Sequence, residues 1–131
     1  MTSADNTQVG GEHYKGAAIQ HWNMAAAAEL GYFEGQITKY LSRFRKKNGV
    51  EDIDKALHFA IKLCELAETG RRRQANHGAP SHVSDWCASN EFDLTLSSVL
   101  VGAVLWRTSD DLRSLIDDIR GIRTAYEAEK C

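Results

Sequence analysis

A short basic stretch followed at once by acids is the part of this sequence best suited to chemistry. Residues 39–47 contain no acid and five cations, namely Lys39, Arg43, Arg45, Lys46 and Lys47. After an Asn48-Gly49 pair come the acids Glu51, Asp52 and Asp54. Arginine and lysine bind phosphate oxygens, and carboxylates bind Mg²⁺ or orient an acceptor hydroxyl. The stretch therefore predicts a phosphate-binding site, with or without a metal ion.

The same charges have a second explanation, which the sequence leaves open. Cations at the end of one helix and acids at the start of the next are stabilised by the helix dipoles, whatever the protein does. Other common sites are missing, because the sequence has no GxxxxGK[ST] loop, no GxGxxG, no nucleophile elbow and no HExxH. Residues 39–55 are therefore the candidate site.

A helical hairpin is needed to bring the two halves of this site together. Apolar residues at spacings of three and four predict one helix over residues 33–48 and another over 51–69. Further helices are predicted over residues 20–31, 82–89, 91–106 and about 109–128, with Thr108 or Ser109 capping the last one. The expected fold is all-α, with five or six helices built from antiparallel hairpins.

A degenerate internal repeat is also expected. At an offset of 64 residues, five similar pairs align: Trp22 with Trp86, Leu30 with Leu94, Ile37 with Val101, Leu41 with Leu105, and Arg43 with Arg107. After a shorter turn, residues 51–53 align with residues 110–112. The second half keeps the apolar pattern but loses most of the cations, which assigns the chemistry to the first half.

Length and composition place the helices in one domain. The chain has 131 residues and a net charge of −2. We expect a flexible segment at residues 1–12 and a single helical domain at 13–131, divided into a motif-bearing half (13–69), a linker (70–81) and a scaffold half (82–131). The net charge argues against nucleic acid as a partner.

Location and assembly follow from a few further residues. The three cysteines, Cys64, Cys87 and Cys131, have no metal-binding spacing and indicate a reducing compartment. The sequence has neither a signal peptide nor an apolar run long enough for a membrane span. We therefore expect a cytoplasmic protein. Trp86 and Trp106 exceed what one small core is expected to hide, so we also expect a homo-oligomer.

Residues 9–66 resemble a small phage-encoded protein family. The residues that carry the resemblance are an HY pair, then GQITKYLSRFRKKNG, then EDIDKALHF. The matching positions are His13, Tyr14, Gly35, Lys39, Tyr40, Arg43, Lys46, Lys47, Asp52, Lys55 and Ala56. Gln36 departs from the asparagine that is frequent in the family. Residues 70–131 lie outside the resemblance, so substrate specificity is not carried over.

The resemblance implies a nucleotide kinase without a P-loop, since the characterised member of the family phosphorylates deoxynucleoside monophosphates. On this reading, Lys39, Arg43 and Asp52 are catalytic, and Glu51 or Asp52 would hold Mg²⁺. The substrate and its phosphates would contact His13, Tyr14, Lys15, Tyr40, Arg45, Lys46, Lys47, Glu51 and Lys55. Two alternatives stay open, namely a protein that binds or sequesters a nucleotide without catalysis, and a nucleic-acid interaction module.

Overall fold

Six α-helices account for most of the chain in a computed structural model that describes residues 18–130. They are α1 (His21–Ala28), α2 (Tyr32–Arg43), α3 (Val50–Glu68), α4 (Ala79–Ser89), α5 (Leu94–Leu105) and α6 (Ser109–Glu129). No strand occurs among the described residues, and the expected all-α fold is confirmed. The predicted contacts His13, Tyr14 and Lys15, together with Cys131, lie outside this range.

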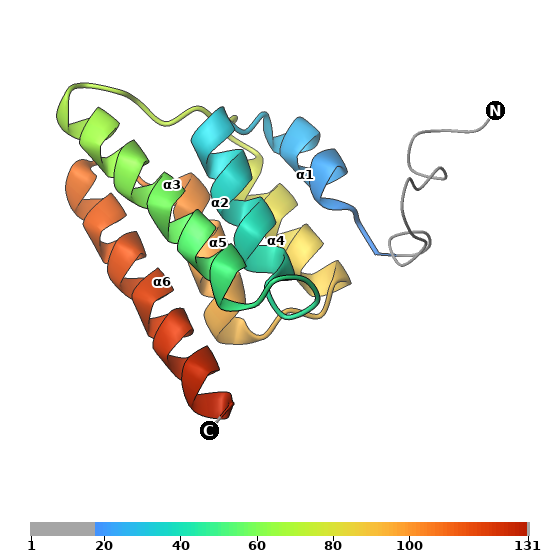
Figure 1. Cartoon of the computed structure of the whole chain (residues 1–131). Coiled ribbons are helices and arrows are strands. Elements are labelled where there is room, and N and C mark those ends of the chain that lie inside the picture. The colour runs from blue at the N-terminus through green and yellow to red at the C-terminus, as the bar shows by residue number, and fades with distance from the viewer. Residues whose placement is uncertain (1–17, 131) are drawn as a thin grey trace.

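The helices pack in corresponding pairs. α2 and α3 form the expected hairpin, and α6 lies along the other side of α3 (Figure 1). α1 packs against α4, α2 against α5, and α3 against α6, so each helix of the first half contacts its counterpart in the second. The core lies between them and includes the fully buried side chains of Ile37, Leu41, Ile53, Leu100 and Ile119.

Burial supports the internal repeat but shifts its register. The predicted offset pairs Leu41, which is fully buried, with Leu105, which is 48% exposed. An offset two residues shorter pairs buried residues with buried residues at four positions in and directly after the first two helices. The pairs are Met24 with Trp86, Ile37 with Val99, Leu41 with Ala103, and Phe44 with Trp106.

The third helices of the two halves keep the predicted register, and their first turns are built alike. The Asp52 carboxylate accepts a hydrogen bond from the Asn48 backbone N–H at 3.1 Å. The Asp111 carboxylate accepts one from the Arg107 backbone N–H at 2.8 Å. Each acid therefore satisfies the backbone N–H four residues before it, at the start of its helix.

Several helix ends differ from the predicted ones. α2 ends at Arg43, and residues 44–49 form a hydrogen-bonded turn that contains Lys46 and Lys47. α1 ends at Ala28, and the left-handed residue after it is Glu29 (φ 54°). Gly31, predicted to end α1, instead precedes α2. The local turn hydrogen bonds decide these ends, and helical periodicity carries no information about them.

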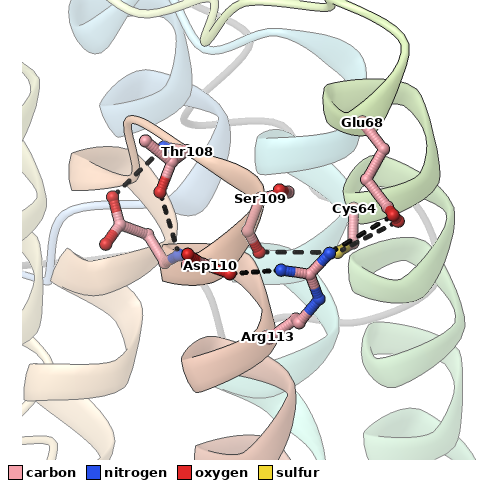
Figure 2. A network of polar contacts seen from close by, with 7 residues as sticks. Cys64, Glu68, Thr108, Ser109, Asp110 and Arg113 are labelled. Carbon is pink, nitrogen blue, oxygen red and sulfur yellow. Dashed lines mark hydrogen bonds and ion pairs between the residues drawn. The ribbon is translucent and has the colours of Figure 1, made fainter.

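Polar contacts join the C-terminal end of α3 to the N-terminal end of α6 (Figure 2). The Arg113 guanidinium of α6 contacts Glu68 of α3 at 3.2 Å and also pairs with Asp110. The sequence left Thr108 and Ser109 as alternative caps of α6; the cap is Thr108, which forms a capping box with Asp111. Near these residues the buried Cys64 thiol donates to the Ser109 carbonyl at 3.6 Å.

Both tryptophans that motivated the expectation of a homo-oligomer are accommodated within one chain. Trp86 and Trp106 are each only 2% exposed. The apolar stripe of α6 is also buried against the other helices, through Leu112, Leu115 and Ile119. These side chains therefore give no support to the expected homo-oligomer, whereas other large apolar side chains, among them Trp22, Leu94 and Leu105, stay exposed on the described helices. Within residues 18–130, every helix falls short of the length and apolarity needed to cross a bilayer.

Candidate functional site

Three of the predicted phosphate-binding cations gather around the ring of Tyr40. The Arg43 guanidinium carbon lies 4.6 Å from the ring centroid, and the Lys39 and Lys55 nitrogens lie 5.5 and 5.3 Å from it. Tyr40 and Phe59 stack at 6.0 Å with an interplanar angle of 10°. Lys39 and Arg43 are one helical turn apart on α2, and the hairpin brings Lys55 of α3 beside them. We call Lys39, Arg43 and Lys55, with Tyr40 at their centre, the Tyr40 cluster.

Asp52 anchors Arg43 from the protein interior. The Asp52 carboxylate is fully buried, and its Oδ2 lies 3.5 Å from Arg43 Nε. The other carboxylate oxygen, Oδ1, and Arg43 Nε are buried without a hydrogen-bond partner among the described residues. Arg43 keeps 25% of its side chain exposed. The predicted catalytic acid is therefore enclosed behind the arginine, and its charge restrains the position of the guanidinium.

The positive charge of Lys39 is not neutralised by any carboxylate within residues 18–130. The charge of Lys39 affects the pKa of His21. A ring nitrogen of His21 lies 2.8 Å from Thr38 Oγ1. The pKa of His21 is lowered from 6.5 to about 4, mainly by burial and secondly by the charge of Lys39. A hydrogen bond to the Gly35 backbone acts in the opposite direction and raises this pKa. His21 is therefore neutral at pH 7, and it adds no positive charge to the cluster.

Lys55 is paired only weakly. Its ammonium lies 3.9 Å from the Glu51 carboxylate, and both side chains are well exposed at 42% and 65%. An exposed pair of this kind contributes little to stability and is screened by salt. A phosphate can therefore compete for Lys55 at low energetic cost.

Arg45 lies away from the Tyr40 cluster. Its guanidinium pairs with Glu129 of α6 at 2.8 Å and packs over the rings of Phe44 and Tyr126. Lys46 and Lys47 lie exposed in the turn after α2. The structure thus divides the basic stretch into one group around Tyr40 and another directed towards the turn and α6.

A groove runs along α3 next to the Tyr40 cluster. Its volume is about 720 Å³, and it is lined by Phe33, Val50, Glu51, Asp54, Lys55, His58, Phe59 and Lys62. We call it the α3 groove. Lys55 and Phe59 belong both to this groove and to the surroundings of Tyr40, so the two features are continuous.

Sequence reasoning missed the aromatic part of this site. The helical spacing of Phe33 and Ile37 predicts that Phe33 is buried, but it and Phe59 are only partly buried. The available signal was the spacing of Lys55, Phe59 and Lys62, which places the Phe59 ring on the same face of α3 as two lysines.

Metal-binding groups are sparse in the part of the chain that the structure describes. No group of three or more His, Cys, Asp or Glu side chains is arranged to hold a metal ion there. Mg²⁺ commonly needs only one or two carboxylates when substrate phosphates complete its shell. Glu51, which is exposed beside Lys55, fits that role better than the enclosed Asp52.

The fold and site thus define an all-α protein with a cation cluster beside an aromatic groove. The chain is similar over residues 9–60 to a family described as a protein of unknown function, DUF3310. The matched segment contains the whole Tyr40 cluster and Phe59, and it ends before Lys62 and the second half of the chain. No curated protein and no solved structure matches the chain.

Proposed function

We propose that this protein binds a nucleotide, with its phosphates on the Tyr40 cluster and its base in the α3 groove. The observation that carries the proposal is the gathering of Lys39, Arg43 and Lys55 around one ring at the mouth of an aromatic groove. Arginine and lysine supply charge-assisted hydrogen bonds to phosphate. A base stacked on an aromatic side chain contributes about 1–3 kcal/mol. The predicted contacts from His13, Tyr14 and Lys15 belong to the same proposal.

Phosphoryl transfer to a nucleoside monophosphate is the second candidate function. It is favoured by the concentration of cations, which can neutralise a transferring phosphoryl group, and by the exposed carboxylate of Glu51 beside Lys55. In this candidate, Glu51 would share Mg²⁺ with the substrate phosphates, and the group that accepts the phosphoryl from a nucleoside triphosphate is a phosphate oxygen of the monophosphate. Asp52 acts as a positioning residue for Arg43, because its buried carboxylate does not reach a ligand in the groove.

Calorimetric titration with the common nucleoside mono- and triphosphates tests the proposed binding. We expect Lys39→Gln to weaken binding about 10- to 100-fold, as loss of a hydrogen bond to a charged group costs roughly 1.5–3 kcal/mol. The matched control is Arg120→Gln, which removes one positive charge from an exposed α6 residue that pairs with Asp117. Unchanged affinity in Lys39→Gln, or no nucleotide binding by the wild type, would contradict the proposal.

A coupled assay with the same nucleotides separates the two candidates. Turnover that requires Lys39 and Glu51 would support phosphoryl transfer. Nucleotide binding without turnover above background, in the presence and absence of Mg²⁺, would exclude it and leave binding as the function.

A further inference from the structure

Aromatic side chains continue along the surface beyond the Tyr40 cluster. Phe59 contacts Phe33 with ring centroids 6.2 Å apart, and Tyr32 lies edge-on to both rings at 5.3 and 5.8 Å. Tyr32 is 61% exposed. Phe33 and Phe59 line the α3 groove and are only partly buried, and Tyr32 lies beside them. The surface therefore offers more stacking area than one base requires.

A second cation stands at the other end of this aromatic row. The Arg71 guanidinium carbon lies 5.4 Å from the centroid of Phe33. One of its nitrogens donates to Gln74 Oε1 at 3.0 Å, and Arg71 has no carboxylate partner in the range that the structure describes. Four of the five N–H donors of an arginine thus remain for a ligand. Arg73 differs, because its side chain donates to the Trp106 carbonyl.

The segment that carries Arg71 is held in place by the helices. The Gly31 backbone N–H donates to the Gln74 carbonyl at 2.6 Å, and the Asn76 N–H donates to the Ala28 carbonyl at 2.9 Å. The Gln74 N–H in turn donates to the buried Glu34 carboxylate at 3.4 Å. Arg71 lies three residues before Gln74, and its own backbone N–H donates to the Leu66 carbonyl at 3.0 Å. The backbone that carries Arg71 is therefore restrained on both sides, which limits the entropy lost when its side chain binds an anion.

The row thus has cations at both ends and aromatic rings between them. Lys39 and Arg43 stand at the Tyr40 end, and Arg71 stands at the Phe33 end. Sites for single-stranded nucleotides combine a cationic track with aromatic platforms in this way. A mononucleotide has its phosphates on one side of one base, so it can occupy only one end. A ligand with two bases and a phosphate near each end matches the whole row.

We infer that the ligand of this site is a dinucleotide phosphorylated at both ends, with one terminal phosphate on the Tyr40 cluster and the other terminal phosphate on Arg71. This inference rests on the proposed function, because it extends the same groove. The two bases stack against Phe59 and against the Phe33–Tyr32 pair. Free dinucleotides and the end of a single strand share this chemistry, and the length of the bound nucleic acid distinguishes them.

Titration of the full chain with three thymidine ligands tests the inference. The probes are the 5′-monophosphate, the dinucleotide phosphorylated at both ends, and a ten-residue oligothymidylate. We expect the dinucleotide to bind at least tenfold more tightly than the monophosphate, and the oligonucleotide to bind no more tightly than the dinucleotide. Equal affinities for the first two ligands would overturn the inference, and so would markedly tighter binding of the oligonucleotide.

Two neighbouring arginines provide a matched pair of variants. Arg71→Gln should abolish the advantage of the dinucleotide and leave the affinity for the monophosphate unchanged. Arg72→Gln removes the same charge from an exposed side chain next to it and should change neither affinity. Urea unfolding confirms that both variants are folded. A dinucleotide advantage that persists in Arg71→Gln would refute the inference.

The outcomes separate this inference from the proposed function. If Lys39→Gln weakens binding of the monophosphate while the dinucleotide has no advantage, nucleotide binding stands and the second phosphate site is refuted. If the wild type binds neither these three ligands nor any of the common nucleoside mono- and triphosphates, both fail. A second copy of the chain is the other candidate occupant of the groove, and sedimentation measurements test it. A dimer that dissociates when Tyr32 is replaced by serine would assign the groove to that second copy and overturn the dinucleotide inference.

Discussion

Replacing Asp52 by alanine distinguishes an acid that positions Arg43 from one that acts on the ligand. The change removes the acceptor of the Asn48 N–H, which costs about 1 kcal/mol at a helix start. It also removes the partner of Arg43. Breaking a fully buried ion pair costs about 3–5 kcal/mol, but the 25% exposure of the Arg43 side chain lets this cation regain water, and we reduce that part to about 1–2 kcal/mol. The free energy of unfolding should therefore fall by about 2–3 kcal/mol.

Urea unfolding at pH 7 measures this loss, and Asp111→Ala is the matched control. Asp111 accepts the corresponding backbone hydrogen bond at the start of α6, but it is exposed and has no buried cation to hold. Its replacement should cost less than that of Asp52. The folded Asp52→Ala protein should still bind nucleotide, several-fold more weakly, because Arg43 is no longer restrained. Wild-type stability combined with complete loss of binding would refute this reasoning and return Asp52 to a direct role on the ligand.

Three further measurements follow from the structure. Gly31→Ala should lower the free energy of unfolding by about 1–3 kcal/mol, because a Cβ there would lie 2.6 Å from Gln74 Oε1. Gly35→Ala should raise the free energy of unfolding by about 0.5–1 kcal/mol, because a Cβ at this position meets nothing within 4 Å. A loss of stability in this variant would contradict the packing of α2. The pKa of His21 is lower in the folded protein (about 4) than the ordinary 6.5. The contribution of neutral His21 to the free energy of unfolding is therefore complete above pH 6.5 and is lost as the pH falls towards 4. Between pH 7.5 and 5 this amounts to about 2 kcal/mol, which His21→Gln should remove from the pH dependence of urea unfolding. Finally, nucleotide affinity should fall with rising salt, and an affinity independent of salt between 50 and 500 mM would argue against phosphate contacts.

Much of the secondary structure could be predicted because it depends on neighbouring residues. The apolar stripe of α2, with Ile37 and Leu41, follows from the helical period alone. The cap of α6 at Thr108 follows from its short polar side chain. The end of α2 could not be predicted in the same way, because the turn at 44–49 is stabilised by its own hydrogen bonds and by the buried Asp52 carboxylate.

The sequence by itself determined that Lys39 and Arg43 share one face of a helix, since residues four apart do so in any α-helix. It also determined that acids follow the basic stretch. Only the tertiary structure decided which cations meet. Packing of α6 against α3 draws Arg45 to Glu129, and the hairpin carries Lys55 to Tyr40.

The same holds for the groove. Phe33, Phe59 and Arg71 come from two helices and a connecting segment, and nothing in their spacing relates them. Their contact results from burial of the apolar faces of α2 and α3 and from the hydrogen bonds that hold residues 74–76 against the ends of α1 and α2. Such contacts depend on how surfaces that are far apart in the sequence fit together, so local sequence patterns do not predict them.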